Sequence, residues 1–154
     1  LTWGAFTYPI AFLVTDLANR VYGLNFAKRI IIIGFFWGVV VSSFFSLKVI
    51  DLISLRIVIG SGLAFLSAQM IDAIIFDKLR NQSRWYVPPI ISSSIASFFD
   101  TIIFFSIAFY NTGVPWVTLS IGDFCVKMIM ALSLLIPFRL ILLNFFLVNR
   151  SSSN

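Results

Sequence analysis

The chain has 154 residues, of which 60% are hydrophobic and only 11% are charged, and its mean hydropathy is +1.02. A soluble domain carries about a quarter of charged residues, so this composition excludes a water-soluble globular protein. The net charge of +5 does not indicate nucleic-acid binding, because the Lys and Arg residues stand between apolar runs, as topology signals do in membrane proteins.

The residue types present exclude several kinds of chemistry. The sequence contains no His and no Glu, and Cys125 is its single cysteine. It therefore lacks the usual ligands of zinc, the usual general base, the triad of serine hydrolases and the pair needed for an internal disulfide. We expect neither an enzyme nor a protein that needs a metal or another cofactor.

Five apolar stretches are long enough to cross a bilayer, for which a helix needs about 20 residues. We predict spanning helices at residues 3–21, 30–50, 57–76, 88–110 and 116–148. Pro9 predicts a kink in the first, and Pro137 with Arg139 predicts a kink or an exit to the membrane surface in the last. The predicted fold class is all-α, a polytopic helical membrane protein with one domain at residues 1–150 and a polar tail at 151–154.

Basic residues predict the orientation of the chain. Those on one side are Arg20, Lys28 and Arg29 after the first stretch, Lys78, Arg80 and Arg84 after the third, and Arg150 after the fifth. The opposite connections contain Lys48, Asp51 and Arg56, and then no charge at residues 111–115. The positive-inside rule therefore places the C-terminus in the cytoplasm and Leu1 outside. No signal peptide is expected, and a first residue other than Met suggests a missing upstream helix.

The fourth stretch carries an aspartate, Asp100, near the middle of residues 88–110. A central Asp costs about 2.5 to 3.5 kcal/mol on translocon-based scales, so such a residue normally faces protein or a watery cavity. Ser93, Ser97, Asp100 and Phe104 follow a spacing of four, three and four, which places them on one helical face. We therefore expect Asp100 to belong to a functional site.

Three other stretches carry polar pairs at helical spacing. They are Asp16 with Asn19, Gln69 with Asp72, which share a face with Phe65, and Asp123 with Lys127. The first pair is either a polar helix end or the inner mouth of a cavity. The second provides either hydrogen bonds between helices or a ligand or ion site. In the third, Lys127 neutralises either Asp123 or a carboxylate of another helix, such as Asp100.

Convergence of these polar residues on a shared interior lowers the cost of placing them in the membrane. Carboxylates accept N–H bonds, amides donate and accept, and Phe rings stack on planar groups. Such an interior favours a flat, polar solute over a lipid or a bare ion. Small residues at spacing four, Gly34 with Gly38 and Ser93 with Ser97, predict close helix packing.

Several blocks of the sequence, in order, resemble the bacterial queuosine precursor transporter family, also called vitamin uptake transporters. They are TWGAFTYPIAFLVTDLANRVYG, GLAFLSAQMIDAIIFDKLR, RWYVPPIISSS, DTIIFFSIAFY and GDFCVKMIMALSLLIP. The resemblance implies about six transmembrane helices in the bacterial inner membrane, with both termini cytoplasmic. It also implies import of 7-deazaguanines such as 7-cyano-7-deazaguanine. It places TWGAF after an earlier helix, so five of the six are expected here.

The resemblance also implies the residues of a substrate site. They are Asp16, Gln69, Asp72, Asp100, Asp123 and Lys127. A 7-deazaguanine presents a ring N–H and an exocyclic amine side by side, and one carboxylate accepts from both. We hypothesise that Asp100 or Asp72 binds this edge, that Gln69 binds the carbonyl side, and that Phe65 or Phe104 stacks on the ring.

Two alternatives to a self-contained importer stay open at this point. The sequence has no GxxxxGK[ST] phosphate loop, so a substrate-binding subunit would borrow the ATPase of another protein. A non-transporting membrane scaffold or assembly subunit would use its polar residues only to hold helices together. Facilitated and proton-coupled transport are equally open, as is a homo-oligomer. The expected partners are the small-molecule substrate and the lipid bilayer, without nucleic acid.

Overall fold

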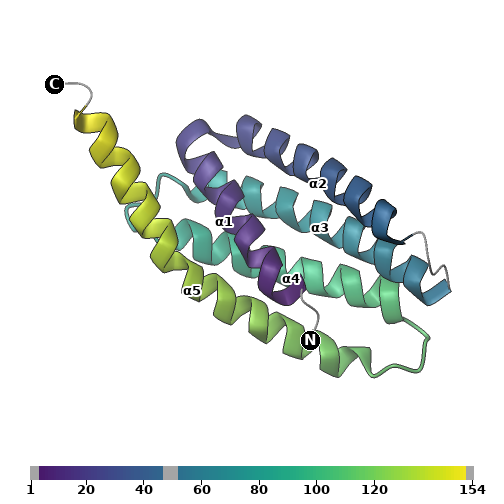
Figure 1. Ribbon diagram of the computed structural model, residues 1–154. Helices are drawn as coiled ribbons and strands as arrows, with labels where there is room; N and C mark the ends of the chain where they lie inside the picture. The colour runs from purple at the N-terminus through teal and green to yellow at the C-terminus, as the bar shows by residue number, and fades with distance from the viewer. Residues whose placement is uncertain (1–3, 47–51, 152–154) are drawn as a thin grey trace.

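The structure is a computed structural model that describes residues 4–46 and 52–151, with side chains at 7–42, 52 and 54–145. The described residues form five helices and no strand, which confirms the predicted all-α class. They are α1 (Gly4–Tyr22), α2 (Leu24–Ser46), α3 (Leu52–Leu79), α4 (Val87–Phe109) and α5 (Trp116–Ser151), and they lie side by side in one bundle (Figure 1).

Four of the described helices are long and apolar enough to cross a membrane. The qualifying segments are Leu24–Ser42, Ser54–Leu79, Val87–Phe109 and Trp116–Phe145. The first predicted span forms α1, which has 19 residues and is the most polar of the five. Helix α1 is not among these four segments, so its crossing of the membrane remains a prediction. The beginning of the first predicted span, the end of the second and most of the polar tail lie outside the described residues.

The turn between α1 and α2 is a single residue, Gly23. Its φ of 85° lies in the left-handed region that glycine adopts without steric cost, and its N–H donates to the carbonyl of Asn19 over 2.9 Å. The second helix therefore starts at Leu24, and Lys28 and Arg29 lie within it rather than in the predicted loop. Helix propensity, not hydropathy, sets this boundary, since Lys and Arg are good helix formers.

The fourth helix follows the prediction to within one residue at each end. Pro88 and Pro89 occupy its first turn, where proline has no N–H bond to lose. Beyond its last residue, Asn111 and Gly113 adopt φ values of 61° and 77°, which reverse the chain toward α5. The guanidinium of Arg56 on α3 donates 2.9 Å hydrogen bonds to the carbonyls of Ile107 and Tyr110, so it caps this end.

The last helix continues through Pro137 without a break in its assignment and has 36 residues. At 1.5 Å per residue it is about 54 Å long, which exceeds the roughly 30 Å hydrocarbon core of a bilayer. Its C-terminal part extends past the other helices (Figure 1). Near this point the guanidinium of Arg139 lies 5.0 Å from the ring centroid of Trp85 in the α3–α4 connection, a cation–π contact.

Helices α3 and α4 share the most extensive interface in the bundle. Small side chains allow this approach, because Ala64, Ala68 and Ala96 are fully buried and a Cβ on Gly60 would lie 3.4 Å from Ile107. The prediction that Gly34 and Gly38 allow close helix packing is wrong within the described residues. A Cβ on either one would meet nothing within 4 Å, since this face of α2 is not covered.

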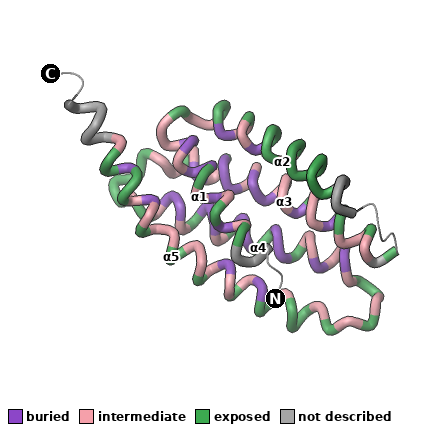
Figure 2. Tube along the Cα trace, in the orientation of Figure 1, coloured by how far each residue is buried: buried purple, intermediate pink, exposed green. Residues whose placement is uncertain are grey.

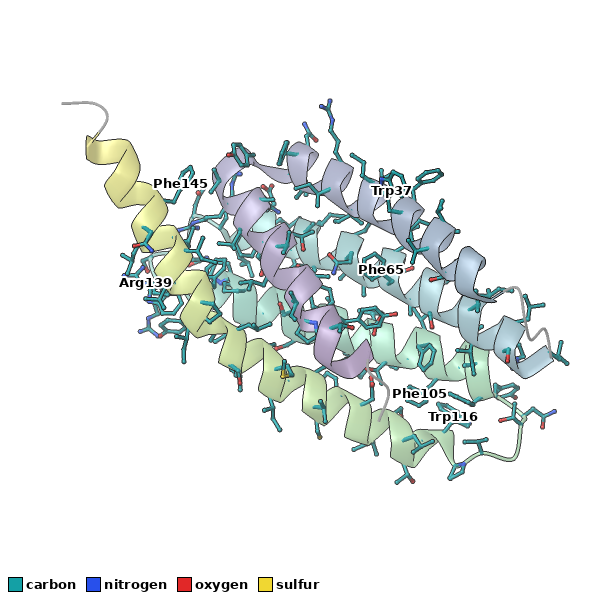
Figure 3. The ribbon with its side chains drawn as sticks, in the orientation of Figure 1. Trp37, Phe65, Phe105, Trp116, Arg139 and Phe145 are labelled. Carbon is teal, nitrogen blue, oxygen red and sulfur yellow. The ribbon has the colours of Figure 1, made fainter. Side chains whose placement is uncertain are left out.

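The surface of the bundle is apolar and its interior is partly polar, which is the arrangement a bilayer favours. Helix α2 exposes most of its length, and Trp37 projects outward with 60% of its surface accessible (Figures 2 and 3). The buried residues of α1, α3 and α4 lie on the sides that these helices turn toward each other (Figure 2). Carboxylates and amides are among them, and they define the candidate site.

Candidate functional site

A buried lysine joins two helices through two carboxylates. Lys127 of α5 donates from Nζ to Oδ2 of Asp100 on α4 over 2.6 Å, and it also contacts Oδ2 of Asp123 one turn away on its own helix. All three side chains are at most 5% exposed. Both partners that the sequence left open for Lys127 are therefore used at once, and two carboxylates surround one ammonium group.

Two further side chains complete this ion cluster. The hydroxyl of Thr101 donates to Oδ2 of Asp123 over 3.1 Å and accepts from Lys127 over 3.3 Å. The Nζ of Lys127 also lies 5.7 Å from the ring centroid of Tyr8 on α1, within the range of a cation–π contact. The cluster thus ties α4 and α5 together and reaches α1. We name Asp100, Thr101, Asp123 and Lys127 the ion cluster.

A second polar group lies between α1 and α3. The hydroxyl of Thr15 lies 3.0 Å from Oε1 of Gln69, and the amide of Asn19 donates to the carbonyl of Ala73 over 2.7 Å. Each of these side chains is at most 4% exposed. The amide predicted to bind a ligand and the asparagine predicted at a cavity mouth therefore also hold two helices together.

Two carboxylates meet within this second group. Asp16 of α1 and Asp72 of α3 are 2% and 0% exposed, and their side chains are within hydrogen-bonding reach of each other. Ser93 of α4 donates to Oδ1 of Asp72 over 3.4 Å. Two contacting carboxyl groups repel each other unless a proton or a ligand N–H lies between them. We name Asp16, Asn19, Gln69, Asp72 and Ser93 the carboxyl–amide cluster.

Several atoms of this cluster are buried without a hydrogen-bond partner. Among the described side chains they include Oδ1 of Asp16, Oδ1 of Asn19, Nε2 of Gln69 and Oδ2 of Asp72. Most buried polar atoms in proteins are paired, and an unpaired one costs about 1 to 3 kcal/mol. Three acceptors and one donor on two neighbouring helices are thus available to a hydrogen-bonding partner.

One face of α4 connects the two clusters. Ser93, Ser97 and Asp100 are each at most 5% exposed, and the first and last are seven positions apart, about 10 Å along the axis. The hydroxyl of Ser97, between them, has no partner among the described side chains. The polar face predicted from the spacing of α4 is therefore buried, and it runs through the interior from one cluster to the other.

The space beside the carboxyl–amide cluster is small. A cavity of about 20 Å³ touches Asp16 and Ser93 and is otherwise lined by apolar residues of α1, α4 and α5. This volume holds about one water molecule, whereas small-molecule pockets measure about 300 Å³ or more. The helices are therefore closed around these polar groups in the described conformation.

The two predicted aromatic partners lie in different surroundings. Phe65 packs 5.7 Å from the ring of Tyr8 and 6.5 Å from that of Phe35, centroid to centroid, so it lies near the ion cluster, which Tyr8 also contacts. The ring contacts of Phe104 are with Phe105 and Phe109 of its own helix. Of the two, Phe65 is the better placed to contact a ligand in the interior.

Sequence reasoning missed three buried hydroxyl residues in or beside these clusters, namely Thr15, Ser92 and Thr101. Each of them is adjacent in the sequence to a residue that the sequence analysis names. A hydroxyl residue next to an intramembrane polar residue is therefore the signal that could have identified all three. Asp77 lies outside both clusters. It is 3.3 Å from Arg80, and because both side chains are partly exposed, the two form a surface ion pair.

The helices and their buried charges define a multi-pass helical membrane protein. The chain belongs to the family described as "Putative vitamin uptake transporter", whose model matches residues 2–142. No solved structure matches the chain.

Two relatives carry names that state a function. A "Probable queuosine precursor transporter" of Haemophilus influenzae is 35% identical over 161 residues, which cover 93% of this chain and 68% of the relative. A "Queuosine precursor transporter" of Escherichia coli K12 is 32% identical over 164 residues, 95% of this chain and 74% of the relative. The resemblance inferred from the sequence blocks is thereby confirmed.

Proposed function

We propose that this protein is a transporter that imports queuosine precursors, 7-deazaguanine bases, across the bacterial inner membrane. The observation that supports this proposal best is the set of unpaired polar atoms in the carboxyl–amide cluster. Family membership and the names of the two relatives support the same transport function. The proposal includes no catalytic role.

The chemistry of the unpaired atoms matches that of the base. A 7-deazaguanine offers a ring N–H and an exocyclic amine on one edge, and Asp72 Oδ2 and Asp16 Oδ1 are free acceptors. The neighbouring carbonyl of the base needs a donor, and Gln69 Nε2 is free to supply one. Asp72 is better suited than Asp100 to bind this edge, because Lys127 already neutralises Asp100. The ion cluster then positions α4 and α5 around the site.

Substrate entry requires the helices to separate, since the cavity at Asp16 holds only about 20 Å³. The helices that line it are α1, α4 and α5, and the α3–α4 pair has the most extensive interface. We therefore expect α1 to move against the α3–α4 pair, to which the ion cluster holds α5. Alternation between an inward and an outward opening would then expose Asp72 to each side in turn.

Basic residues support a cytoplasmic location for one end of the bundle. The α1–α2 turn and the α3–α4 connection lie at the same end (Figure 1). Arg20, Lys28 and Arg29 lie close to the turn, and Arg80 and Arg84 lie within the connection. By the positive-inside rule this end faces the cytoplasm, as does the C-terminal end of α5. Transport would then run from the opposite end toward this one.

The experiment is uptake of radiolabelled 7-cyano-7-deazaguanine by cells that neither make it nor carry their own importer. Expression of the protein should raise uptake, and Asp72→Asn should abolish the increase while membrane insertion is unchanged. Asp77→Asn removes the same charge from a partly exposed ion pair and is the matched control. Unchanged uptake despite confirmed insertion would contradict the proposal.

The two alternatives are separated by reconstitution. A subunit that depends on an ATPase would show no uptake in purified, ATP-free vesicles. A self-contained transporter would show uptake in the same vesicles. A scaffold would use its polar groups only for helix packing, and the unpaired atoms at Asp16 and Gln69 are not explained by that role. A scaffold also predicts that Asp72→Asn impairs assembly before it impairs substrate binding.

A further inference from the structure

We propose that a basic groove at the end of α1 binds the phosphate group of an anionic membrane lipid. The groove has a volume of about 490 Å³ and is lined by Arg20, Arg80, Asn81 and Gln82. All four side chains are polar, and two carry a positive charge. It is separate from the carboxyl–amide cluster, and its role does not depend on the identity of the transported solute.

The two arginines of the groove have an unbalanced charge. Their guanidinium groups are close enough to repel each other. Asp77 pairs with Arg80 at 3.3 Å, but no described side chain forms an ion pair or hydrogen bond with Arg20. A phosphate between two guanidinium groups removes this repulsion and accepts several charge-assisted hydrogen bonds, and Arg is the side chain best suited to that geometry.

One of the guanidinium groups is held in place before any ligand arrives. Arg80 donates from Nη1 to the carbonyl of Asn19 over 3.4 Å and pairs with Asp77. It also lies against Gly23, where a Cβ would stand 3.4 Å from Nη1. A preorganised donor loses less conformational entropy on binding, so it favours a specific site over a diffuse positive surface.

The location of the groove favours a lipid over a soluble anion. It lies where α1 and the spanning helix α3 end, and two exposed aromatic residues, Tyr22 and Phe26, follow Arg20 closely in the chain. Their ring centroids are 4.7 Å apart. Exposed aromatic residues at helix ends mark the headgroup level of a bilayer, and basic residues at that level attract anionic lipids. The apolar face of α2 begins directly beside them and gives acyl chains a surface to follow.

The test measures lipid binding by the purified full chain. Thermal stability and native mass spectra are recorded while phosphatidylglycerol or phosphatidylcholine is titrated into the detergent-solubilised protein. Phosphatidylglycerol should stabilise the protein and stay bound in the spectra, and phosphatidylcholine should not. Arg20→Gln should weaken the apparent affinity for phosphatidylglycerol about tenfold or more, the effect of losing a charged hydrogen-bond donor.

Arg29→Gln is the matched control, because Arg29 is exposed on α2 and its replacement changes the net charge equally. Its affinity for phosphatidylglycerol should stay within about twofold of the unchanged protein, since an exposed charge contributes little. Arg20→Gln should fold, since no described contact depends on that side chain. Arg80→Lys keeps the positive charge but loses the planar guanidinium group with its several N–H donors, so it too should weaken lipid binding.

Two results would overturn the proposal. If Arg20→Gln and Arg29→Gln bind phosphatidylglycerol equally well, binding depends only on the overall positive charge at this end of the bundle and not on the groove. If inorganic phosphate stabilises the protein as strongly as phosphatidylglycerol at equal concentration, and Arg20→Gln removes that effect, the groove is a site for a soluble anion.

Discussion

Lys127 Nζ lies 2.6 Å from Asp100 Oδ2, and both side chains are 2% exposed. Desolvation makes such a pair costly to bury and more costly still to break, because removal of one partner leaves the other charge uncompensated. Here the ammonium group also serves Asp123, so its loss would strand two carboxylates. Stability of the α4–α5 interface therefore depends on one lysine.

Replacement of this lysine gives the first prediction. Lys127→Met should destabilise the protein by about 3 to 5 kcal/mol, the range for breaking a buried ion pair. The double variant Lys127→Met with Asp100→Asn should recover part of that loss, since one stranded charge is removed. Thermal denaturation in detergent measures both. A double variant less stable than Lys127→Met alone would contradict the assignment.

The carboxyl–amide cluster gives the second prediction. Gln69→Leu should lower affinity for a 7-deazaguanine about tenfold or more, because it removes the free donor that we assign to the carbonyl of the base. Binding to the purified protein is measured by calorimetry. Gln82→Leu, an exposed glutamine outside the cluster, is the control and should bind normally. Equal affinity in the two variants would remove Gln69 from the site.

The close approach of α3 and α4 gives the third prediction. Gly60→Leu should destabilise the protein by about 1 to 3 kcal/mol, the usual cost of overpacking, because even a Cβ at this position lies 3.4 Å from Ile107 and from the carbonyl of Phe104. Gly34→Leu should be tolerated, since its Cβ meets nothing within 4 Å. Resistance to unfolding by SDS compares the two. The interface is looser than described if both variants behave alike.

Arg56 gives the fourth prediction. Its guanidinium donates to the carbonyls of Ile107 and Tyr110, so Arg56→Ala leaves the end of α4 with two acceptors unpaired. We expect a loss of about 1 to 2 kcal/mol, less than for a buried charged bond because the second bond is exposed. Hydrogen exchange in the last turn of α4 should accelerate. Arg29→Ala, with an exposed side chain, serves as the comparison and should leave this turn protected.

The sequence predicted the helices well where local chemistry decides. The bounds of α4 follow from prolines in its first turn and from turn residues after Tyr110. The start of α2 was missed by six residues, since Lys28 and Arg29 lower hydropathy without disfavouring a helix. Gly34 and Gly38 show the opposite error, because a spacing of four indicates a face but not whether another helix covers it.

The residues of the site could be predicted from the sequence, but which of them contact one another could not. An intramembrane charge is costly, so Asp72, Asp100 and Lys127 stand out in any apolar stretch. Which residues meet depends on how far each helix is rotated and shifted against its neighbours, and spacing within one helix does not contain that information. For this reason the sequence left two partners open for Lys127 and did not separate the ion cluster from the carboxyl–amide cluster.

The single-residue turn at Gly23 means that α1 and α2 move together. Helix α2 is mostly exposed, so its tilt adjusts to the thickness of the surrounding bilayer. Because no flexible loop absorbs that tilt, it is transmitted to Asp16 and Asn19, which lie in the last two turns of α1. Substrate uptake should therefore vary with the acyl-chain length of the host membrane, which vesicles of graded lipid length would measure.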